Sequence, residues 1–159
     1  MHDRFERFCR ARAYADMPAE DLMNETLLIA YSKIDQLQNK GAFLSFLIGI
    51  SRRILANKKR KQQPIIPKQE LPMEIIGKSY DPVQQKNTVA FLHFGLAQLP
   101  EAQREALILF EITGFSIKEI SEIQQSSTSA VKQRLARGRK ALAEIVKKEL
   151  QNSTTNVGS

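Results

Sequence analysis

Residues 115–140 read FSIKEISEIQQSSTSAVKQRLARGRK, and this stretch decides the fold of the C-terminal part of the chain. Ser116 and Glu119 have the spacing of a helix capping box, and Phe115 and Ile120 have the spacing of a hydrophobic staple. The pattern therefore predicts a helix that begins just after Ser116.

A second helix is expected after the polar turn 124–127, because Ser127 or Thr128 can cap it. At about 100° per residue, one side of this helix is apolar and consists of Val131, Leu135, Gly138 and Leu142. The opposite side consists of Ser129, Gln133, Ala136, Arg137 and Lys140, with Lys132 and Arg139 on a flank. Small residues allow close approach and long ones reach base edges, which favours a helix-turn-helix in a DNA major groove. A solvated basic face on an ordinary helical hairpin is the alternative interpretation.

The bulk properties of the chain agree with a nucleic-acid partner. Its 159 residues allow one ordinary domain or two small ones. A net charge of +7 favours a polyanion such as nucleic acid. The single cysteine, Cys9, excludes a disulfide framework and favours a reducing compartment. No apolar run approaches the roughly 20 residues that span a bilayer, so we expect a cytoplasmic protein without membrane insertion.

The N-terminal part begins with a predicted short helix within residues 1–15. A longer helix is predicted from Pro18 to about Leu37, with Asp16 as its cap. Its apolar side consists of Leu22, Thr26, Ile29, Ala30, Ile34 and Leu37. Its other side consists of Asp21, Asn24, Glu25, Leu28, Ser32 and Asp35. An acidic face with one exposed leucine on a basic protein favours protein docking, and simple solvation of these polar residues is the alternative.

A third helix is predicted from Ala42 to about Lys61. Its core stripe consists of Phe43, Leu47, Ile50 and Ile54, and the opposite side carries Ser45, Gly49, Arg52, Ala56 and Lys59. Residues 52–61 contain six cations and no acid. Small residues between cations favour contact with a phosphate backbone. Cations placed to complement the helix dipole are the alternative explanation.

The segment 62–81 contains several prolines and no helical periodicity, which predicts a flexible linker. Fully extended, it could reach about 60 Å, enough to join two DNA-binding modules. A tether between two independent folding units is the alternative.

Further helices are predicted from Pro82 to Leu99 and from Pro100 to Thr113, with Gly114 as the terminating C-cap residue. Residues 152–159 are predicted to be disordered.

Several blocks of the sequence resemble the extracytoplasmic-function sigma factors of the sigma-70 family. AEDLMNET at 19–26 and FLSFLIGISRR at 43–53 are similar to sigma domain two. LPEAQRE at 99–105, GFSIKEI at 114–120 and VKQRLARGR at 131–139 are similar to sigma domain four. The resemblance implies an all-α fold of two small helical domains, at 1–61 and 82–151, joined by a flexible linker, the second domain being a helix-turn-helix.

The resemblance also implies a function and its residues. It implies a bacterial transcription initiation factor that binds core RNA polymerase and promoter DNA, with an anti-sigma factor as a further partner. Polymerase docking would use Asp21, Asn24, Glu25 and Leu28. Contact with the −10 element would use Arg52, Arg53, Ala56, Asn57, Lys59 and Arg60. Contact with the −35 element would use Ser116, Lys118, Thr128, Ser129, Lys132, Gln133, Arg134, Ala136, Arg137 and Lys140.

This sequence departs from the family pattern at several positions. The family usually has glutamine at the position of Asn24 and asparagine at that of Arg53. Its turn usually carries a glycine and an apolar residue where this chain has Gln125 and Ser126. The family also has a longer leading helix before Asp16.

Other functional classes receive less support from the sequence. Cys9 and the two histidines do not form a metal-ligand pattern, and there is no glycine-rich phosphate loop or nucleophile motif. We therefore expect no cofactor and no enzymatic activity. A stand-alone dimeric helix-turn-helix regulator is an alternative, which would bind a palindrome. A degenerate sigma factor that only titrates a regulator is another.

Overall fold

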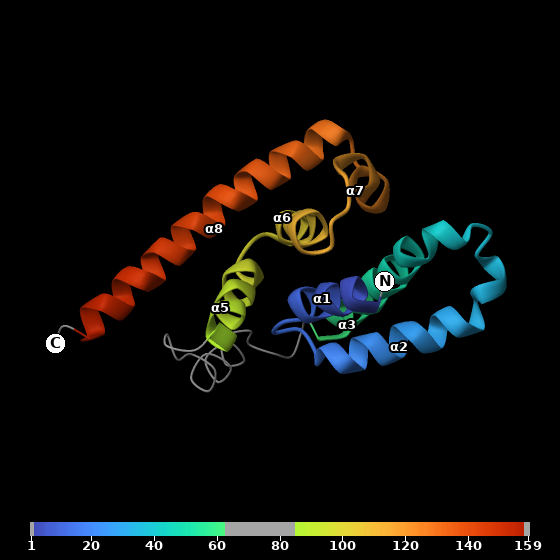
Figure 1. Ribbon diagram of the computed structural model, residues 1–159, viewed down its shortest axis with the longest axis horizontal. Helices are drawn as coiled ribbons and strands as arrows, with labels where there is room; N and C mark the ends of the chain where they lie inside the picture. The colour runs from blue at the N-terminus through green and yellow to red at the C-terminus, as the bar shows by residue number, and fades with distance from the viewer. Residues whose placement is uncertain (1, 63–84, 158–159) are drawn as a thin grey trace.

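The computed structural model describes residues 2–62 and 85–157, and this part of the chain consists of helices joined by short turns and contains no strand (Figure 1). The predicted all-α fold is confirmed. The N-terminal half contains α1 (His2–Arg12), α2 (Ala19–Ser32), η1 (Ile34–Gln36), η2 (Lys40–Ala42) and α3 (Phe43–Gln62). The C-terminal half contains α5 (Gln85–Ala97), α6 (Glu101–Leu107), η3 (Ile108–Ile112), α7 (Ile117–Gln124) and α8 (Thr128–Val157). The predicted linker 62–81 and the helix start at Pro82 lie outside the described residues, except for Gln62.

In the N-terminal half, α2 and α3 pack against each other and α1 lies across both (Figure 1). Leu22 of the predicted apolar side of α2 and Leu47 and Ile50 of that of α3 are buried, and so is Ile48, which was not predicted to be. Thr26 of α2 and Ser51 of α3 are buried too, and their hydroxyl oxygens hydrogen bond to each other at 3.0 Å. This pairing explains why polar side chains fit inside the helix contact.

In the C-terminal half, α8 packs on α6 and α7 through its apolar side. Gly138 is what lets α8 approach α6, because a Cβ atom there would lie 2.9 Å from Cδ1 of Leu107. The π-helical turn η3 ends at Ile112, Thr113 caps it, and Gly114 follows with a φ of +85°. The predicted C-cap glycine thus has the left-handed conformation that such caps use.

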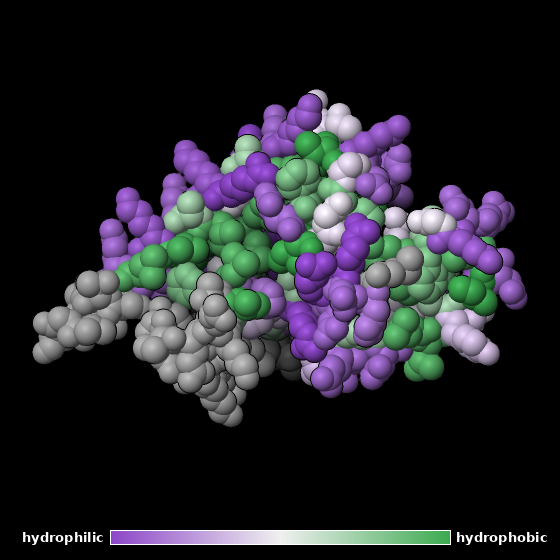
Figure 2. Space-filling view, in the orientation of Figure 1, coloured by the Kyte–Doolittle hydropathy of each residue, from purple (hydrophilic) through white to green (hydrophobic). Residues whose placement is uncertain are grey.

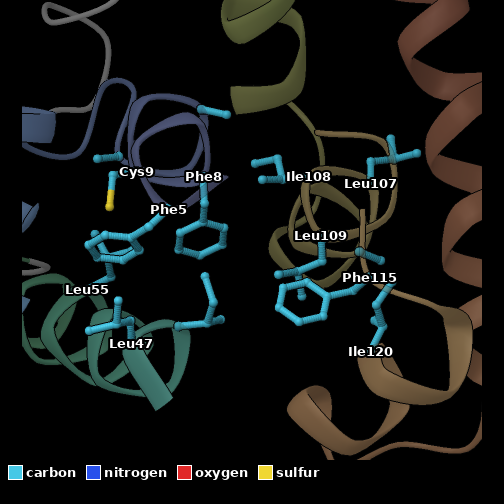
Figure 3. Packing of buried hydrophobic residues seen from close by; sticks show 14 of the residues in the cluster. Phe5, Phe8, Cys9, Leu47, Leu55, Leu107, Ile108, Leu109, Phe115 and Ile120 are labelled. Atoms are coloured by element: carbon cyan, nitrogen blue, oxygen red, sulfur yellow. The ribbon is translucent and has the colours of Figure 1, made fainter. Parts of the chain in front are cut away.

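The two halves are packed together through α1. Figure 3 shows Phe5 and Phe8 of α1 next to Leu47 of α3, with Ile108 and Leu109 of η3 on the side facing the C-terminal half. All these side chains are buried in one cluster that spans both halves. The sequence predicted two modules joined by a linker and gave no indication that they pack on each other.

Some helix boundaries differ from the prediction. Asp16 does not cap α2, because its carboxylate is held by Arg12 and Arg104 instead. Helix α2 ends at Ser32, and Ile34, predicted on its apolar side, is 43% exposed because it belongs to the following turn. Helix α8 continues to Val157, so most of the tail predicted to be disordered is helical. Residues 158–159 lie outside the described part.

Candidate nucleic-acid interface

The predicted helix-turn-helix is formed by α7 and α8. Ser116 Oγ accepts a hydrogen bond from the backbone amide of Glu119 at 3.1 Å, and the Glu119 carboxylate accepts one from the amide of Ser116 at 3.0 Å. These bonds are the two halves of a capping box. Ser127 Oγ accepts a hydrogen bond from the amide of Ala130 at 3.0 Å. Ser127 rather than Thr128 therefore caps α8.

The turn between the two helices is regular although it lacks glycine. Gln125 has φ 52° and ψ 49°, in the left-handed region. Its amide donates to the Glu122 carbonyl, and the amide of Ser126 donates to the Ser121 carbonyl at 2.9 Å. These two bonds are those of a Schellman motif. A glutamine therefore occupies the left-handed position of this turn, at a cost of about 1 kcal/mol relative to glycine.

Helix α8 presents most of the predicted −35 residues to solvent. Val131 and Leu135 are buried against the rest of the C-terminal half. The residues exposed on the other side are Thr128, Ser129, Lys132, Gln133, Ala136, Arg137 and Lys140. Figure 2 shows hydrophilic residues along the outer edge of α8. Ser116 and Lys118 are also exposed, at the start of α7.

Arg134 differs from the other predicted −35 residues. Its guanidinium is partly buried and donates to Gln124 Oε1 at 2.8 Å and to Ser126 Oγ at 3.0 Å. It therefore fastens α8 to the turn that precedes it. The sequence pattern did not predict these contacts, and the contact of Arg134 with the −35 element stays a prediction.

The predicted −10 residues of α3 fall into two groups, according to whether they form an ion pair with α6. Arg53, Ala56, Asn57 and Arg60 are exposed. Arg52 and Lys59 lie on the flank of α3 that faces the C-terminal half, and each forms an ion pair with α6. Arg52 Nε lies 3.0 Å from the Glu105 carboxylate, and Lys59 Nζ lies 3.0 Å from that of Glu101.

The predicted docking residues Asp21, Asn24, Glu25 and Leu28 are all exposed on α2. Leu28 is 71% exposed, and Tyr31, which sequence reasoning did not include, is 83% exposed. Leu27 and Ile34 are exposed nearby. Figure 2 shows a hydrophobic patch at this end of the molecule. The signal that could have identified Tyr31 is its position one turn after Leu28 on an otherwise polar side.

Two guanidinium groups are buried where α1 meets α6. Arg104 donates to the carbonyl oxygens of Arg12 at 2.7 Å and Tyr14 at 2.9 Å, and to the Asp16 carboxylate at 3.2 Å. Arg12 in turn pairs with Glu101 at 2.8 Å. Burial lowers the pKa of Arg104, and the charge of Arg12 acts in the same direction, while Asp16 opposes both. Sequence periodicity could not identify either arginine, because both lie outside the cationic faces.

The described residues contain no group of three or more histidine, cysteine or acidic side chains placed to bind a metal. Cys9 is buried, and burial raises the pKa of its thiol to about 12, so the reactive thiolate is disfavoured. His93 lies against Tyr14, with ring centroids 5.8 Å apart. Burial also lowers the pKa of His93. Within the described ranges, no helix has the length and apolar character needed to span a membrane.

Comparison with known proteins matches both halves of the chain to protein families. Residues 1–65 match sigma-70 region 2, and residues 92–142 match sigma-70 region 4. Among solved structures, the sigma factor RpoE of Bartonella quintana, crystallised with the anti-sigma factor NepR, is similar at a TM-score of 0.71. That match has 24% sequence identity and covers 90% of this chain and 89% of the other.

Individual relatives are similar over most of the chain. The ECF RNA polymerase sigma factor EcfG of Rhodopseudomonas palustris is 31% identical over 133 residues, which cover 80% of this chain and 71% of that protein. The ECF RNA polymerase sigma factor SigD of Mycobacterium tuberculosis is 30% identical over 136 residues, which cover 79% of this chain and 64% of that protein.

Proposed function

This chain belongs to the extracytoplasmic-function sigma factors of the sigma-70 family, and we propose that it binds core RNA polymerase and directs it to promoters by reading their −10 and −35 elements. The observation that carries the proposal is the order of the two matched regions, each of which contains a helix with exposed cations. As a binding factor it would act in the cytoplasm without catalysing a reaction of its own.

The −35 element would be read by α8. Gln133 and Arg137 are exposed on the same side of this helix, one turn apart. Their side chains are long enough to reach base edges, and the exposed Ala136 between them leaves room for the helix in the major groove. Lys132 and Lys140 would contact phosphates and set the register of the helix on the duplex.

The −10 element would be contacted by α3, where the exposed row formed by Arg53, Asn57 and Arg60 follows one flank of the helix. Arg52 and Lys59 on the other flank would join them when they are free of α6. Opening a promoter requires bases to leave the stack, which costs a few kcal/mol. Phosphate contacts from these cations would offset part of that cost.

Polymerase would dock on α2. The exposed acidic groups of Asp21 and Glu25 lie beside the apolar side chains of Leu28 and Tyr31. An apolar centre with a charged rim is the usual composition of a protein interface. This face is separate from the cationic rows of α3 and α8, so DNA and polymerase could be bound together. An anti-sigma factor remains a proposed further partner.

The experiment that tests this function is purification with core RNA polymerase followed by genome-wide run-off transcription. We expect one copy of the chain per polymerase and transcripts that begin downstream of a shared pair of elements. A chain that ignores core polymerase and binds a palindrome as a dimer would contradict the proposal. Binding to polymerase without any directed transcript would indicate a titrating factor instead.

Two variants assign the binding faces. Arg137→Ala should lower affinity for the mapped promoter and relax preference at one −35 position, which corresponds to about 1–3 kcal/mol for a bidentate base contact. An equal loss on all DNA sequences would mean that Arg137 contacts only phosphate.

Asp21→Arg should weaken binding to core polymerase and leave the affinity for −35 DNA unchanged. Unchanged polymerase binding would remove α2 as the docking face.

A further inference from the structure

The two halves of the molecule meet through cations that α3 would also present to DNA. Arg52 and Lys59, on α3, are paired with Glu105 and Glu101, which lie one turn apart on α6. We propose that α6 is an intramolecular latch whose two carboxylates occupy these cations in the free protein and keep them from the −10 element. The inference rests on the proposed function, because it requires α3 to be a DNA-binding helix.

The centre of the latch is the pair formed by Arg52 and Glu105. Only 8% of the Glu105 side chain is exposed. Its Oε2 lies 3.0 Å from Arg52 Nε and 3.8 Å from Arg12 Nε. A second nitrogen of Arg52 donates to the carbonyl of Ile123 in α7. Because Nε and one terminal nitrogen of this arginine are bonded to protein oxygens, a DNA phosphate has to compete with the Glu105 carboxylate and the Ile123 carbonyl for the same guanidinium.

The rim of the latch is weaker than its centre. Lys59 and Glu101 are 43% and 50% exposed, and Arg12 shares the Glu101 carboxylate at 2.8 Å. Exposed pairs contribute little and are screened by salt. Binding of polymerase and DNA could therefore break the pair of Lys59 with Glu101 first, before the buried pair of Arg52 with Glu105.

The polar contacts of the latch extend to α8, the helix proposed to read the −35 element. Glu105 Oε1 accepts a hydrogen bond from Gln124 Nε2 at 3.1 Å, and Gln124 Oε1 accepts one from Arg134 at 2.8 Å. A continuous series of polar contacts thus joins α3, through α6 and the end of α7, to α8. The halves are held together at the very elements that would read the promoter.

The size of a promoter requires this contact to break. The −10 and −35 elements are numbered by their positions upstream of the transcription start. They therefore lie about 25 base pairs apart, which is ~85 Å along a duplex. In the closed chain, by contrast, Arg52 of α3 hydrogen bonds directly to Ile123 of α7. One closed molecule cannot bind both elements at once, so the contact must open before both are engaged. Breaking the latch early should therefore favour DNA binding by the free chain.

The first test detects the closed state by carbodiimide cross-linking, which joins an amine to a carboxylate in direct contact. We expect mass spectrometry of the free full chain to find Lys59 joined to Glu101, and Lys59→Arg to lack the product. Core polymerase plus the mapped promoter should suppress the cross-link. No cross-link in the free chain, or an unchanged yield with polymerase and promoter, would overturn the latch.

The second test measures the affinity of the free chain for a labelled duplex of the mapped promoter. Glu101→Gln and Glu105→Gln should each bind about fivefold more tightly than Glu144→Gln, which makes the same charge change on an exposed part of α8. Affinities equal to that of Glu144→Gln would overturn the proposal. Since Glu105 is buried, thermal melting must show that its variant folds, and otherwise Glu101→Gln decides alone.

Arg53→Ala separates the two proposals, because Arg53 is exposed and takes no part in the latch. Reduced promoter affinity in this variant, without any gain in the glutamine variants, would leave α3 as a DNA-binding helix and remove the latch. If Arg53→Ala has no effect while the cross-link forms, the closed state stands but its proposed function in DNA binding fails.

Discussion

Single residues whose backbone or burial is unusual give the most direct tests of this structure. Gln125 has a left-handed backbone, in which glycine has no steric penalty. We expect Gln125→Gly to raise the free energy of unfolding by about 0.5–1 kcal/mol, measured by urea denaturation. Gln133→Gly, within exposed α8, should lower it by about 1 kcal/mol. A loss of stability in Gln125→Gly would mean that the glutamine side chain stabilises the fold by more than its left-handed backbone costs.

His93 predicts a pH dependence. Burial lowers its pKa in the folded chain, and the charges of Arg104 and Arg10 add to the effect. The unfolded chain therefore takes up the histidine proton first, below a pH of about 6.5. Stability contributed by neutral His93 is complete above that pH and is lost as the pH falls toward the folded pKa.

We expect the melting temperature to fall more between pH 7.5 and pH 5.5 in the native chain than in His93→Gln, which cannot titrate. Differential scanning calorimetry at matched ionic strength would measure the two shifts. The carboxylates with lowered pKa values, Glu6 and Glu101, titrate below this range and should affect both proteins equally. Identical shifts in both proteins would contradict the burial of His93.

At the scale of helices, α2 shows what periodicity predicts and what it misses. The buried positions Leu22, Thr26 and Ala30 follow from helical spacing. The end of the helix at Ser32 does not, because no strong stop signal separates it from the turn that follows. Tyr31 was missed for a related reason, since a tyrosine on the flank of a polar face is compatible with either burial or exposure.

The exposed side of α2 gives an element-scale prediction. Tyr31→Asp should weaken binding to core polymerase about tenfold, as expected when an aromatic residue is removed from an interface centre. Because Tyr31 is 83% exposed, the melting temperature should change little. Val89→Asp, at an exposed apolar position of α5, is the matched control and should leave polymerase binding intact. Affinity measured by fluorescence anisotropy that is equal in the two variants would exclude this face.

For the helix-turn-helix, the sequence predicted more than it did for any other element. The capping box, the C-cap glycine and the exposed side of α8 all follow from local spacing, and local contacts are what sequence patterns encode. Arg134 is the exception within this element. It lies among the predicted DNA contacts in sequence, yet its partners Gln124 and Ser126 become neighbours only when the turn has formed.

At the scale of the whole molecule, the packing of the two halves could not be predicted from the sequence. Its contacts join residues that are far apart in the chain, such as Arg52 with Glu105 and Arg104 with Asp16. Each of these residues is an ordinary charged residue on a helix or in a turn when viewed alone. Arg104 and Glu105 are buried only because the hydrophobic surfaces of α1 and η3 meet beside them. The boundaries of the two domains remain predictions.

Because one buried cluster spans both halves, we predict that the chain unfolds in a single cooperative transition. Phe46 and Phe110 are partly buried in the N-terminal and C-terminal halves, and tryptophan at either position would report on its own half. Urea midpoints from the two reporter variants should coincide. Separate midpoints would show that the halves are stable independently.

Arg104→Ala should break this cooperativity. It removes the guanidinium that α6 inserts against the end of α1, leaving the carbonyl oxygens of Arg12 and Tyr14 without this donor. Removing one partner of a buried charge network costs about 3–5 kcal/mol, so the N-terminal and C-terminal reporters should then show different midpoints. Arg10→Ala is the control, because it breaks only an exposed pair with Glu6 inside α1. It should cost less than about 1 kcal/mol and keep the midpoints together. Coincident midpoints in Arg104→Ala would mean that apolar packing alone couples the halves.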